Sequence, residues 1–277
     1  MNSTLRRNSL SGLVMAAWML VAMPVSAFPE DDGAMRLDAW LDAGVMDFDY
    51  EEFDQGASLD REEGYLPGVS AGLRLAQGRM FAETALEAWT GDVDYASATE
   101  ITTTDEDILD WNILAGRDLF AQADQRLGLY AGLGYRHWQR DILSTPTAFG
   151  LDETYRWWYA IVGLRAESAV TPRVSFRADL QLRRTLDPQI DVRFKSGHDD
   201  ITLELGEANG ARAAFTLEGR ADHGMTLFVT PWFEYWRLGR SANAILTQNG
   251  VPAGTVFEPR SRTHNLGINA GVRWQFF

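Results

Sequence analysis

Two short polar segments carry the residue types that could catalyse hydrolysis. One contains the Asp-x-Asp pair Asp92 and Asp94, and the other contains His198 followed directly by Asp199. A histidine beside a carboxylate can activate a water molecule, which the Asp-x-Asp pair could position. This chemistry requires the two segments to lie within about 10 Å of each other, which is hydrogen-bond reach through one water. Without such convergence, the four side chains are simply solvated in polar loops.

The composition excludes several other kinds of site. The sequence contains no P-loop, no Rossmann glycine pattern and no H-E-x-x-H motif. With four His and no Cys, we expect no metal site and no cofactor, and a disulfide framework is impossible. The formal net charge of -14 argues against a nucleic-acid partner, because phosphate binding needs clustered Lys and Arg.

The N-terminus has the organisation of a secretory signal peptide. Arg6 and Arg7 form a short basic segment, an apolar run of about ten residues follows, and small residues end the segment at Ala27. The apolar run is too short to span a membrane as a helix, because spanning takes about 20 residues. We therefore expect residues 1–27 to be cleaved and residues 28–277 to form one exported domain.

The exported part contains ten segments in which apolar residues alternate with polar or small ones. They lie around residues 35–45, 67–75, 80–90, 109–118, 127–138, 155–165, 174–183, 211–220, 227–236 and 266–275. Such alternation is typical of strands that have one apolar and one polar face. The connections alternate as well. Five are long and polar, at roughly 46–65, 91–106, 141–153, 185–210 and 239–262, and the four between them are short.

This alternation of loop lengths is typical of outer-membrane barrels, which have short periplasmic turns and long external loops. We therefore predict an all-β fold, a transmembrane antiparallel up-and-down β-barrel of ten strands in the bacterial outer membrane. Eight or twelve strands are the alternatives. Residues 201–205 could extend the eighth strand into a tall hairpin above the membrane, or could add a pair of strands.

If the apolar faces contact lipid, the inward faces carry charges of both signs. The predicted lumen charge network comprises Glu83, Glu87, Asp110, Asp118, Arg136, Arg140, Arg165, Arg177, Asp179, Arg183, Arg212, Glu218, Arg220 and Glu234. Its bases are all Arg, whose planar guanidinium pairs with a carboxylate through two parallel hydrogen bonds. Ten strands enclose a narrow lumen. Because four Trp residues also face inward, we expect that lumen to be largely plugged.

The surplus negative charge falls in the predicted long loops. The acids of the first two are Asp47, Asp49, Glu51, Glu52, Asp54, Asp60, Glu62, Glu63, Asp92, Asp94, Glu100, Asp105, Glu106 and Asp107. An acidic rim repels anionic lipid headgroups unless divalent cations bridge them, and it favours cationic ligands. The expected partners are outer-membrane lipid and lipopolysaccharide, with divalent cations or cationic ligands at the loops. Simple solvation is the alternative.

Ten strands with alternating loop lengths resemble the omptins, outer-membrane aspartyl-type endopeptidases that prefer basic peptides. The resemblance covers the topology of most of the chain. In that family an Asp-x-Asp above the third strand faces an Asp-x-His in the loop of the seventh. Here Asp92 and Asp94 fall at the expected place, whereas His198 and Asp199 differ from the family in order and spacing. The resemblance implies that these four residues are the catalytic ones.

Three functions are therefore compatible with the sequence. The packed lumen and acidic loops favour a non-enzymatic barrel with a structural or surface-binding role. A narrow pore or small-solute transporter needs a continuous hydrated path. An omptin-like endopeptidase acting on basic peptides needs its two polar segments to converge.

Overall fold

The computed structural model describes residues 34–121, 125–221 and 224–276. The predicted signal peptide, residues 1–27, lies outside the described residues. Within the described ranges, no helix has the length and apolar character needed to cross a membrane.

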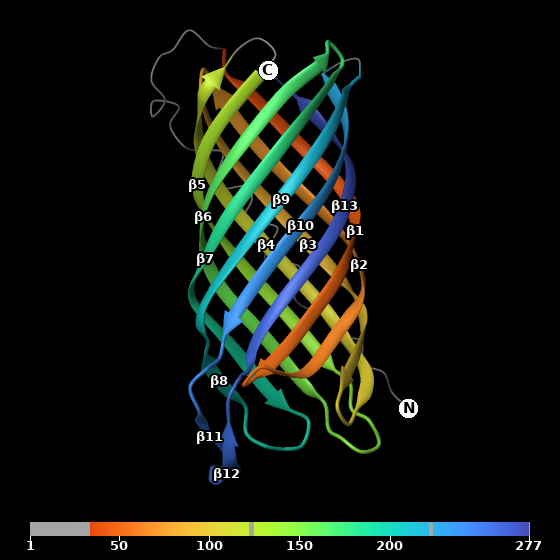
Figure 1. The fold of residues 1–277 in the computed structure, drawn as a ribbon, viewed down its shortest axis with the longest axis vertical. Coiled ribbons are helices and arrows are strands. Elements are labelled where there is room, and N and C mark those ends of the chain that lie inside the picture. Colours follow the sequence, from red (N-terminus) through yellow and green to blue (C-terminus); the bar gives the residue numbers. More distant parts are fainter. Residues whose placement is uncertain (1–33, 122–124, 222–223, 277) are drawn as a thin grey trace. The chain divides into compact units, whose positions relative to one another are not determined.

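Ten long antiparallel strands close into a barrel (Figure 1). They are β1 (Arg36–Asp54), β2 (Ala57–Gln77), β3 (Met80–Ser97), β4 (Ile101–Ala121), β5 (Gln125–Ile142), β6 (Leu151–Thr171), β7 (Val174–Phe194), β9 (Gly206–Arg220), β10 (Met225–Gly239) and β13 (Arg260–Gln275). Each pairs with the next along the chain, and β1 pairs with β13 to close the ring. The prediction of a ten-stranded up-and-down barrel is confirmed, and neither eight nor twelve strands form the wall.

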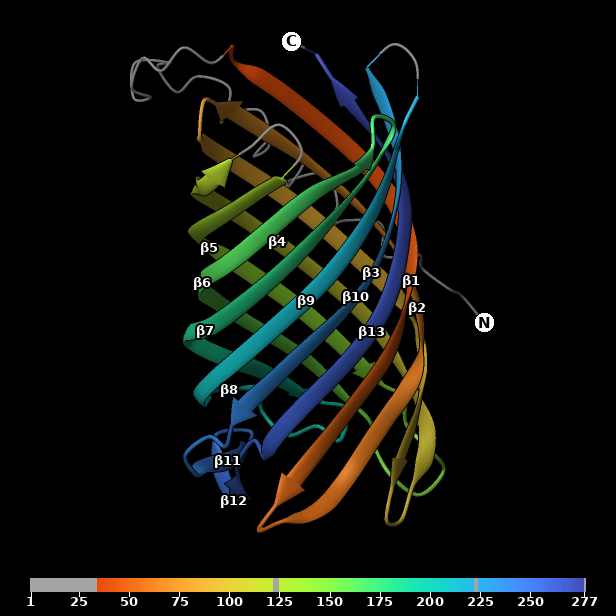
Figure 2. The ribbon, with the colours of Figure 1, turned by 45° about the horizontal axis from the view of Figure 1, so that its top comes forward.

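Three short strands add to the barrel at one end. β8 (Ile201–Glu204) pairs with the end of β7 and is separated from β9 by Leu205 alone. It therefore extends the eighth wall strand into the tall hairpin that was one of the two expectations. β11 (Ala244–Gln248) and β12 (Val251–Val256) form a separate two-stranded hairpin between β10 and β13. We call this end of the barrel the loop end, and the other, where β1 begins and β13 finishes, the termini end (Figure 2).

The segments predicted to be long loops are largely strand, so that expectation is wrong for the first two. β1 continues to Asp54 and β2 begins at Ala57, and the turn between them consists of Gln55 and Gly56, both with positive φ. β3 and β4 are likewise joined by residues 98–100 alone. The physical reason is that crossing a membrane takes only about 9–11 residues of a tilted strand. Apolar residues face outward in that part alone, and beyond it the strands continue with polar outward faces and with buried apolar residues such as Phe48 and Tyr50 inside.

The wall has two zones that follow from this change of polarity. Near the termini end, exposed apolar side chains such as Leu41, Val69 and Leu180 form what we call the apolar belt. Towards the loop end the outward positions become acidic, for example Asp49 on β1 and Glu63 on β2. The apolar belt therefore marks the lipid-facing zone, and the acidic zone projects beyond it.

Candidate functional site

The middle of the lumen is organised around Glu234 on β10. Its two carboxylate oxygens accept hydrogen bonds of 2.6 Å from Arg136 and of 2.6 Å from Arg183, and Arg212 lies 3.6 Å away. Glu234 is 3% exposed, and indole rings including Trp236 pack around this group. The cavity at this level measures about 10 Å³, at the lower limit of the space for one water. We call Glu234, the three Arg residues around it and the indole rings packed against them the middle layer.

In the middle layer, three Arg residues surround the carboxylate of Glu234. Nearer the loop end the balance is reversed, because carboxylates outnumber cations. Arg140 is fully buried and lies 2.7 Å from Glu153, 2.9 Å from Glu62 and 3.3 Å from Glu52. The buried carboxylates of Glu106 and Glu258 and the half-buried carboxylate of Asp60 lie around the same group. We call Arg140 and these six acids the outer layer. One cation thus faces six carboxylates.

Burial of so many acids around one cation changes their protonation. The outer layer lies beyond the apolar belt, in the zone where outward positions are acidic. Burial, with repulsion from Glu52, raises the pKa of Asp60 to about 8. Burial also raises the pKa of Glu153 to about 7, against the attraction of Arg140. Desolvation disfavours the charged form of an acid, and a nearby like charge adds to the effect. Some of these carboxyl groups are therefore protonated at neutral pH.

The outer layer corrects one part of the sequence interpretation. Glu52, Asp60, Glu62 and Glu106 were expected in acidic external loops, but they point into the lumen from β1, β2 and β4. The alternation of inward and outward side chains along a strand could have predicted that these acids face the lumen. Glu52 lies an even number of residues from Asp42, which also faces inward, so the two share one face of β1.

The predicted lumen network lies on the inner face of the wall. Its members are distributed over the middle layer, the outer layer and a group near the termini end that includes Arg165 with Glu83 at 2.8 Å and with Asp179 at 2.7 Å. Asp118 is 4.0 Å from Arg126. Arg220 is exposed and lines the mouth of the lumen at the termini end. The sequence analysis missed Glu167, which pairs there with Arg74 and Arg177.

The four predicted catalytic residues lie in two places. Asp92 and Asp94 are exposed on β3, on the outward face, since Val93 between them is buried. His198 lies in the connection between β7 and β8, where its Nδ1 is 2.7 Å from the hydroxyl of Ser196. Four strand steps of about 4.8 Å each separate β3 from β7 along the wall. The structure therefore groups the residues as two separate pairs.

Asp199 stabilises a turn in another connection of the loop end. Its carboxylate accepts hydrogen bonds from the hydroxyl of Thr247 at 2.7 Å and from the backbone N–H groups of Asn249 and Gly250 at 3.1 and 2.9 Å. These groups form the turn of the β11–β12 hairpin. The hydrogen bonds hold the pKa of Asp199 below its usual range, with the Thr247 hydroxyl contributing most.

Residues 68–72 match the G-x-S-x-G pattern of a serine nucleophile. That pattern works at a sharp strand-to-helix turn, whereas Ser70 lies in the middle of β2. Its buried hydroxyl donates a hydrogen bond of 2.6 Å to Asp42, which also accepts one from the Asn269 amide. Ser70 thus belongs to the polar lining of the lumen.

A row of carboxylates crosses the outer wall beyond the apolar belt. Asp92 on β3 pairs in register with Asp105 on β4, Asp105 with Asp141 on β5, and Asp141 with Asp152 on β6. Lys195 contacts Asp141 and lies 3.1 Å from Asp152. Partial burial, with repulsion from Asp92 and Asp141, raises the pKa of Asp105. We call these four carboxylates the acidic row.

A groove of opposite charge lies elsewhere on the loop end. It has a volume of about 560 Å³, and its lining includes Arg237, Arg240, Arg260 and Arg262 together with Tyr235. Arg262 donates a hydrogen bond of 2.8 Å to Glu51. We call this feature the basic groove. Its lining residue Tyr235 is an aromatic side chain of the kind that marks the membrane interface.

The chain is similar to solved structures of other β-barrels. No family model and no curated protein matches the sequence. The outer membrane protease OmpT from Escherichia coli matches with a TM-score of 0.64 and 11% identity, over 88% of this chain and 97% of that one.

Two further barrels match less well. The translocator domain of the autotransporter NalP from Neisseria meningitidis has a TM-score of 0.45 and 14% identity, over 94% of each chain. The outer membrane protein OprG from Pseudomonas aeruginosa has a TM-score of 0.42 and 8% identity, over 88% of this chain and 97% of that one. At such identities the likeness concerns the fold alone. The chain is a closed antiparallel β-barrel that resembles OmpT in architecture.

Proposed function

We propose that this chain is a closed barrel with a structural and surface-binding role in the outer membrane. The closure of the lumen carries this proposal. The cavity beside Glu234 is about 10 Å³, and the fully buried Arg140 group fills the lumen between it and the loop end. A pore or transporter needs a continuous hydrated path, which these two layers interrupt. Binding of lipid and other surface ligands is then carried by the outer wall.

The outer wall supports binding of lipopolysaccharide in two ways. In the basic groove, guanidinium groups such as Arg237 and Arg260 can bind lipid phosphates directly, since guanidinium matches phosphate geometry. In the acidic row, the neighbouring carboxylates of Asp92 and Asp105 repel each other. A divalent cation relieves that repulsion and can bridge the carboxylates to an anionic headgroup. Both features lie beyond the apolar belt, at the level of headgroups.

The test is binding of lipopolysaccharide to the purified barrel in detergent, with Mg²⁺ or with EDTA. Arg237→Ala combined with Arg260→Ala is expected to weaken binding roughly tenfold or more, because each Arg near an anionic surface contributes about 1 kcal/mol. Asp92→Asn combined with Asp105→Asn is expected to remove the advantage of Mg²⁺ over EDTA. The matched control is Arg173→Ala, an exposed Arg in the β6–β7 turn at the termini end. Equal binding by all variants contradicts the proposal.

An omptin-like endopeptidase is the second candidate. The fold shared with OmpT supports it, and the acidic row attracts basic peptides. It needs Asp92 and Asp94 on β3 to reach His198 and Asp199 in the connection after β7, and β7 is four strands away from β3 along the wall. Cleavage of a basic peptide by the wild type that is lost in Asp92→Asn favours this candidate. Absence of cleavage at any pH from 5 to 9 counts against it.

A further inference from the structure

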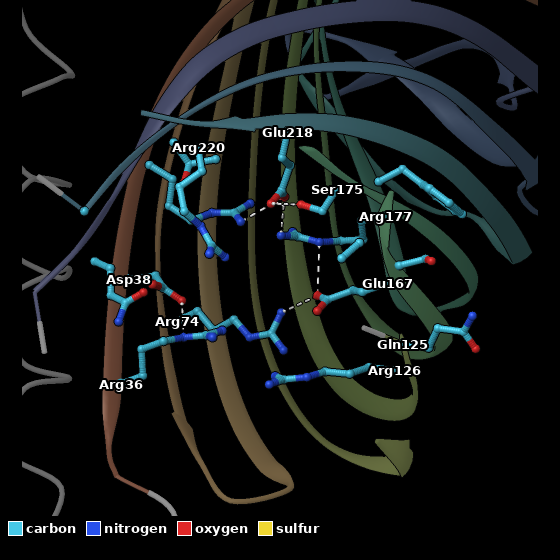
Figure 3. Close-up of a pocket in the computed structure, with 17 residues that line it drawn as sticks. Arg36, Asp38, Arg74, Gln125, Arg126, Glu167, Ser175, Arg177, Glu218 and Arg220 are labelled. Atoms are coloured by element: carbon cyan, nitrogen blue, oxygen red, sulfur yellow. Dashed lines mark hydrogen bonds and ion pairs between the residues drawn. The ribbon is translucent and has the colours of Figure 1, made fainter. Parts of the chain in front are cut away.

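The lumen opens at the termini end into a cavity of about 190 Å³ (Figure 3). That volume is far above the roughly 10–15 Å³ that one water needs. A second cavity of about 150 Å³ adjoins it deeper in the barrel and shares Arg74, Arg177 and Arg273 with it. The middle layer limits the lumen beyond that point. The mouth is therefore a blind vestibule, suited to holding a ligand rather than passing one.

The charged lining of this vestibule is biased towards arginine. Its cations are Arg36, Arg74, Arg126, Arg177, Arg220 and Arg273, and its carboxylates are Asp38, Glu167 and Glu218. Asp118 lies behind the lining and is 4.0 Å from Arg126, which makes four carboxylates for six guanidinium groups. Arg36 has its own partner, because it donates to Asp38 at 3.0 Å.

The imbalance is sharpest at the back of the vestibule, where three guanidinium groups share two carboxylates. Glu167 lies 3.2 Å from Arg74 and 3.2 Å from Arg177. Glu218 lies 2.6 Å from Arg177 and 2.9 Å from Arg273. Arg74 is 6% exposed, and its Nε has no hydrogen-bond partner within the described part of the chain. Figure 3 shows Arg74 and Arg177 pointing towards Glu167, and Arg177 pointing towards Glu218.

The nearby acids supply only part of the missing charge, because Glu83 and Asp179 add one more negative charge than Arg165 adds positive charge, which leaves six carboxylates for seven guanidinium groups. Glu83 and Asp179, the next carboxylates along the lumen, are both held by Arg165, at 2.8 and 2.7 Å. A buried charge that is only partly compensated is costly. A small anion placed among the three Arg residues would restore the balance. Guanidinium binds tetrahedral oxyanions well because its planar donors can make two parallel hydrogen bonds.

We propose that this vestibule is a binding site for a phosphate-class oxyanion, held by Arg74, Arg177 and Arg273. The exposed Arg220 at the rim raises the local concentration of anions. The ligand is free phosphate or the terminal group of a phosphomonoester, since both present the same oxygens. In an outer-membrane barrel with this topology, the termini end opens to the periplasm. The site is thus separate from the proposed lipopolysaccharide surface and does not depend on it.

The test is calorimetric titration of the purified full barrel at constant ionic strength, with inorganic phosphate, glycerol 3-phosphate, and chloride as the reference anion. Saturable 1:1 binding of phosphate is expected, weakened about tenfold in Arg273→Gln through loss of a charge-assisted hydrogen bond. The matched control is Arg184→Gln, an exposed Arg on the outward face of β7, which is expected to bind as the wild type does. Binding of glycerol 3-phosphate identifies a phosphomonoester ligand, and binding of phosphate alone identifies the free ion.

A second variant keeps the proposal testable if Arg273→Gln fails to fold. Glu218→Gln removes a competing carboxylate, so it is expected to bind phosphate more tightly than the wild type. Phosphate is also expected to raise the unfolding temperature of this variant. That temperature is read from the disappearance of the band of the folded barrel on a gel. Heats that match those of chloride overturn the proposal. Equal affinity in the wild type, Arg273→Gln and Glu218→Gln overturns it as well.

Discussion

At the scale of single residues, Gly134 on β5 shows how tightly the lumen is filled. The ring of Tyr159 from β6 lies against it, and a Cβ added to Gly134 would lie 2.1 Å from the ring carbon Cζ. The same Tyr159 hydroxyl donates a hydrogen bond to Asp110, so the ring cannot move away without breaking that contact. Glycine is required here for close approach, not for an unusual backbone angle.

Gly134→Ala is therefore expected to destabilise the barrel by about 1–3 kcal/mol, the usual cost of overpacking a filled interior. The measurement is urea-induced unfolding in lipid vesicles, followed by tryptophan fluorescence. Gly219→Ala on β9 is the matched control, because a Cβ there meets no heavy atom within 4 Å. Its effect should stay within about 0.5 kcal/mol. A similar loss of stability in both variants would contradict this account of the packing.

At the scale of elements, the β11–β12 hairpin depends on one carboxylate from another connection. Asp199 accepts two backbone N–H groups of the hairpin turn, and its own N–H donates to the carbonyl of Thr247 at 2.9 Å. The hairpin forms no other sheet pairing in the described part of the chain. Asp199 is thus its anchor to the connection between β7 and β8.

Asp199→Ala is expected to accelerate amide hydrogen exchange at Asn249 and Gly250, because their acceptor is lost. Exchange in the wall strands should stay unchanged. Asp200→Ala is the control, since that exposed carboxylate contacts only Arg193, at 3.5 Å, among the described residues. Unchanged exchange in the hairpin of Asp199→Ala would show that other contacts hold it.

The wall strands could be predicted from the sequence because lipid and lumen impose opposite polarity on alternate residues. That constraint applies only where lipid is present. Beyond the apolar belt the polarity is reversed, with acids outward and buried residues such as Phe48 and Tyr50 inward, so an alternation scored for an outward apolar face does not continue to the Gln55–Gly56 turn. The gathering of Glu62 with Arg140 depends on pairing register between distant strands, which alternation does not specify.

At the scale of the whole molecule, the outer layer makes stability depend on pH. Asp60 and Glu153 have folded-state pKa values of about 8 and about 7, above their ordinary values near 4. The folded barrel therefore holds protons that the unfolded chain has released. Stability should fall as pH rises from about 4 to about 8, and then level off.

The check is the unfolding midpoint in urea at pH 5, 7 and 9. We expect the midpoint to fall across this series in the wild type and to fall less in Asp60→Asn, which keeps the side chain neutral. Asp94→Asn, on the outward face of β3, serves as the control and should follow the wild type. A midpoint that rises with pH in the wild type would contradict the assignment of raised pKa values to the outer layer.

The central claim is that the middle and outer layers close the lumen. Electrical recording in a planar lipid bilayer tests it most directly, with the purified barrel on one side and 1 M KCl on both. The account predicts no single-channel steps, because the cavity beside Glu234 is about 10 Å³ and Arg140 is fully buried. Reproducible steps from the wild-type barrel, under conditions in which a general porin also conducts, would contradict the closed lumen and favour the narrow pore.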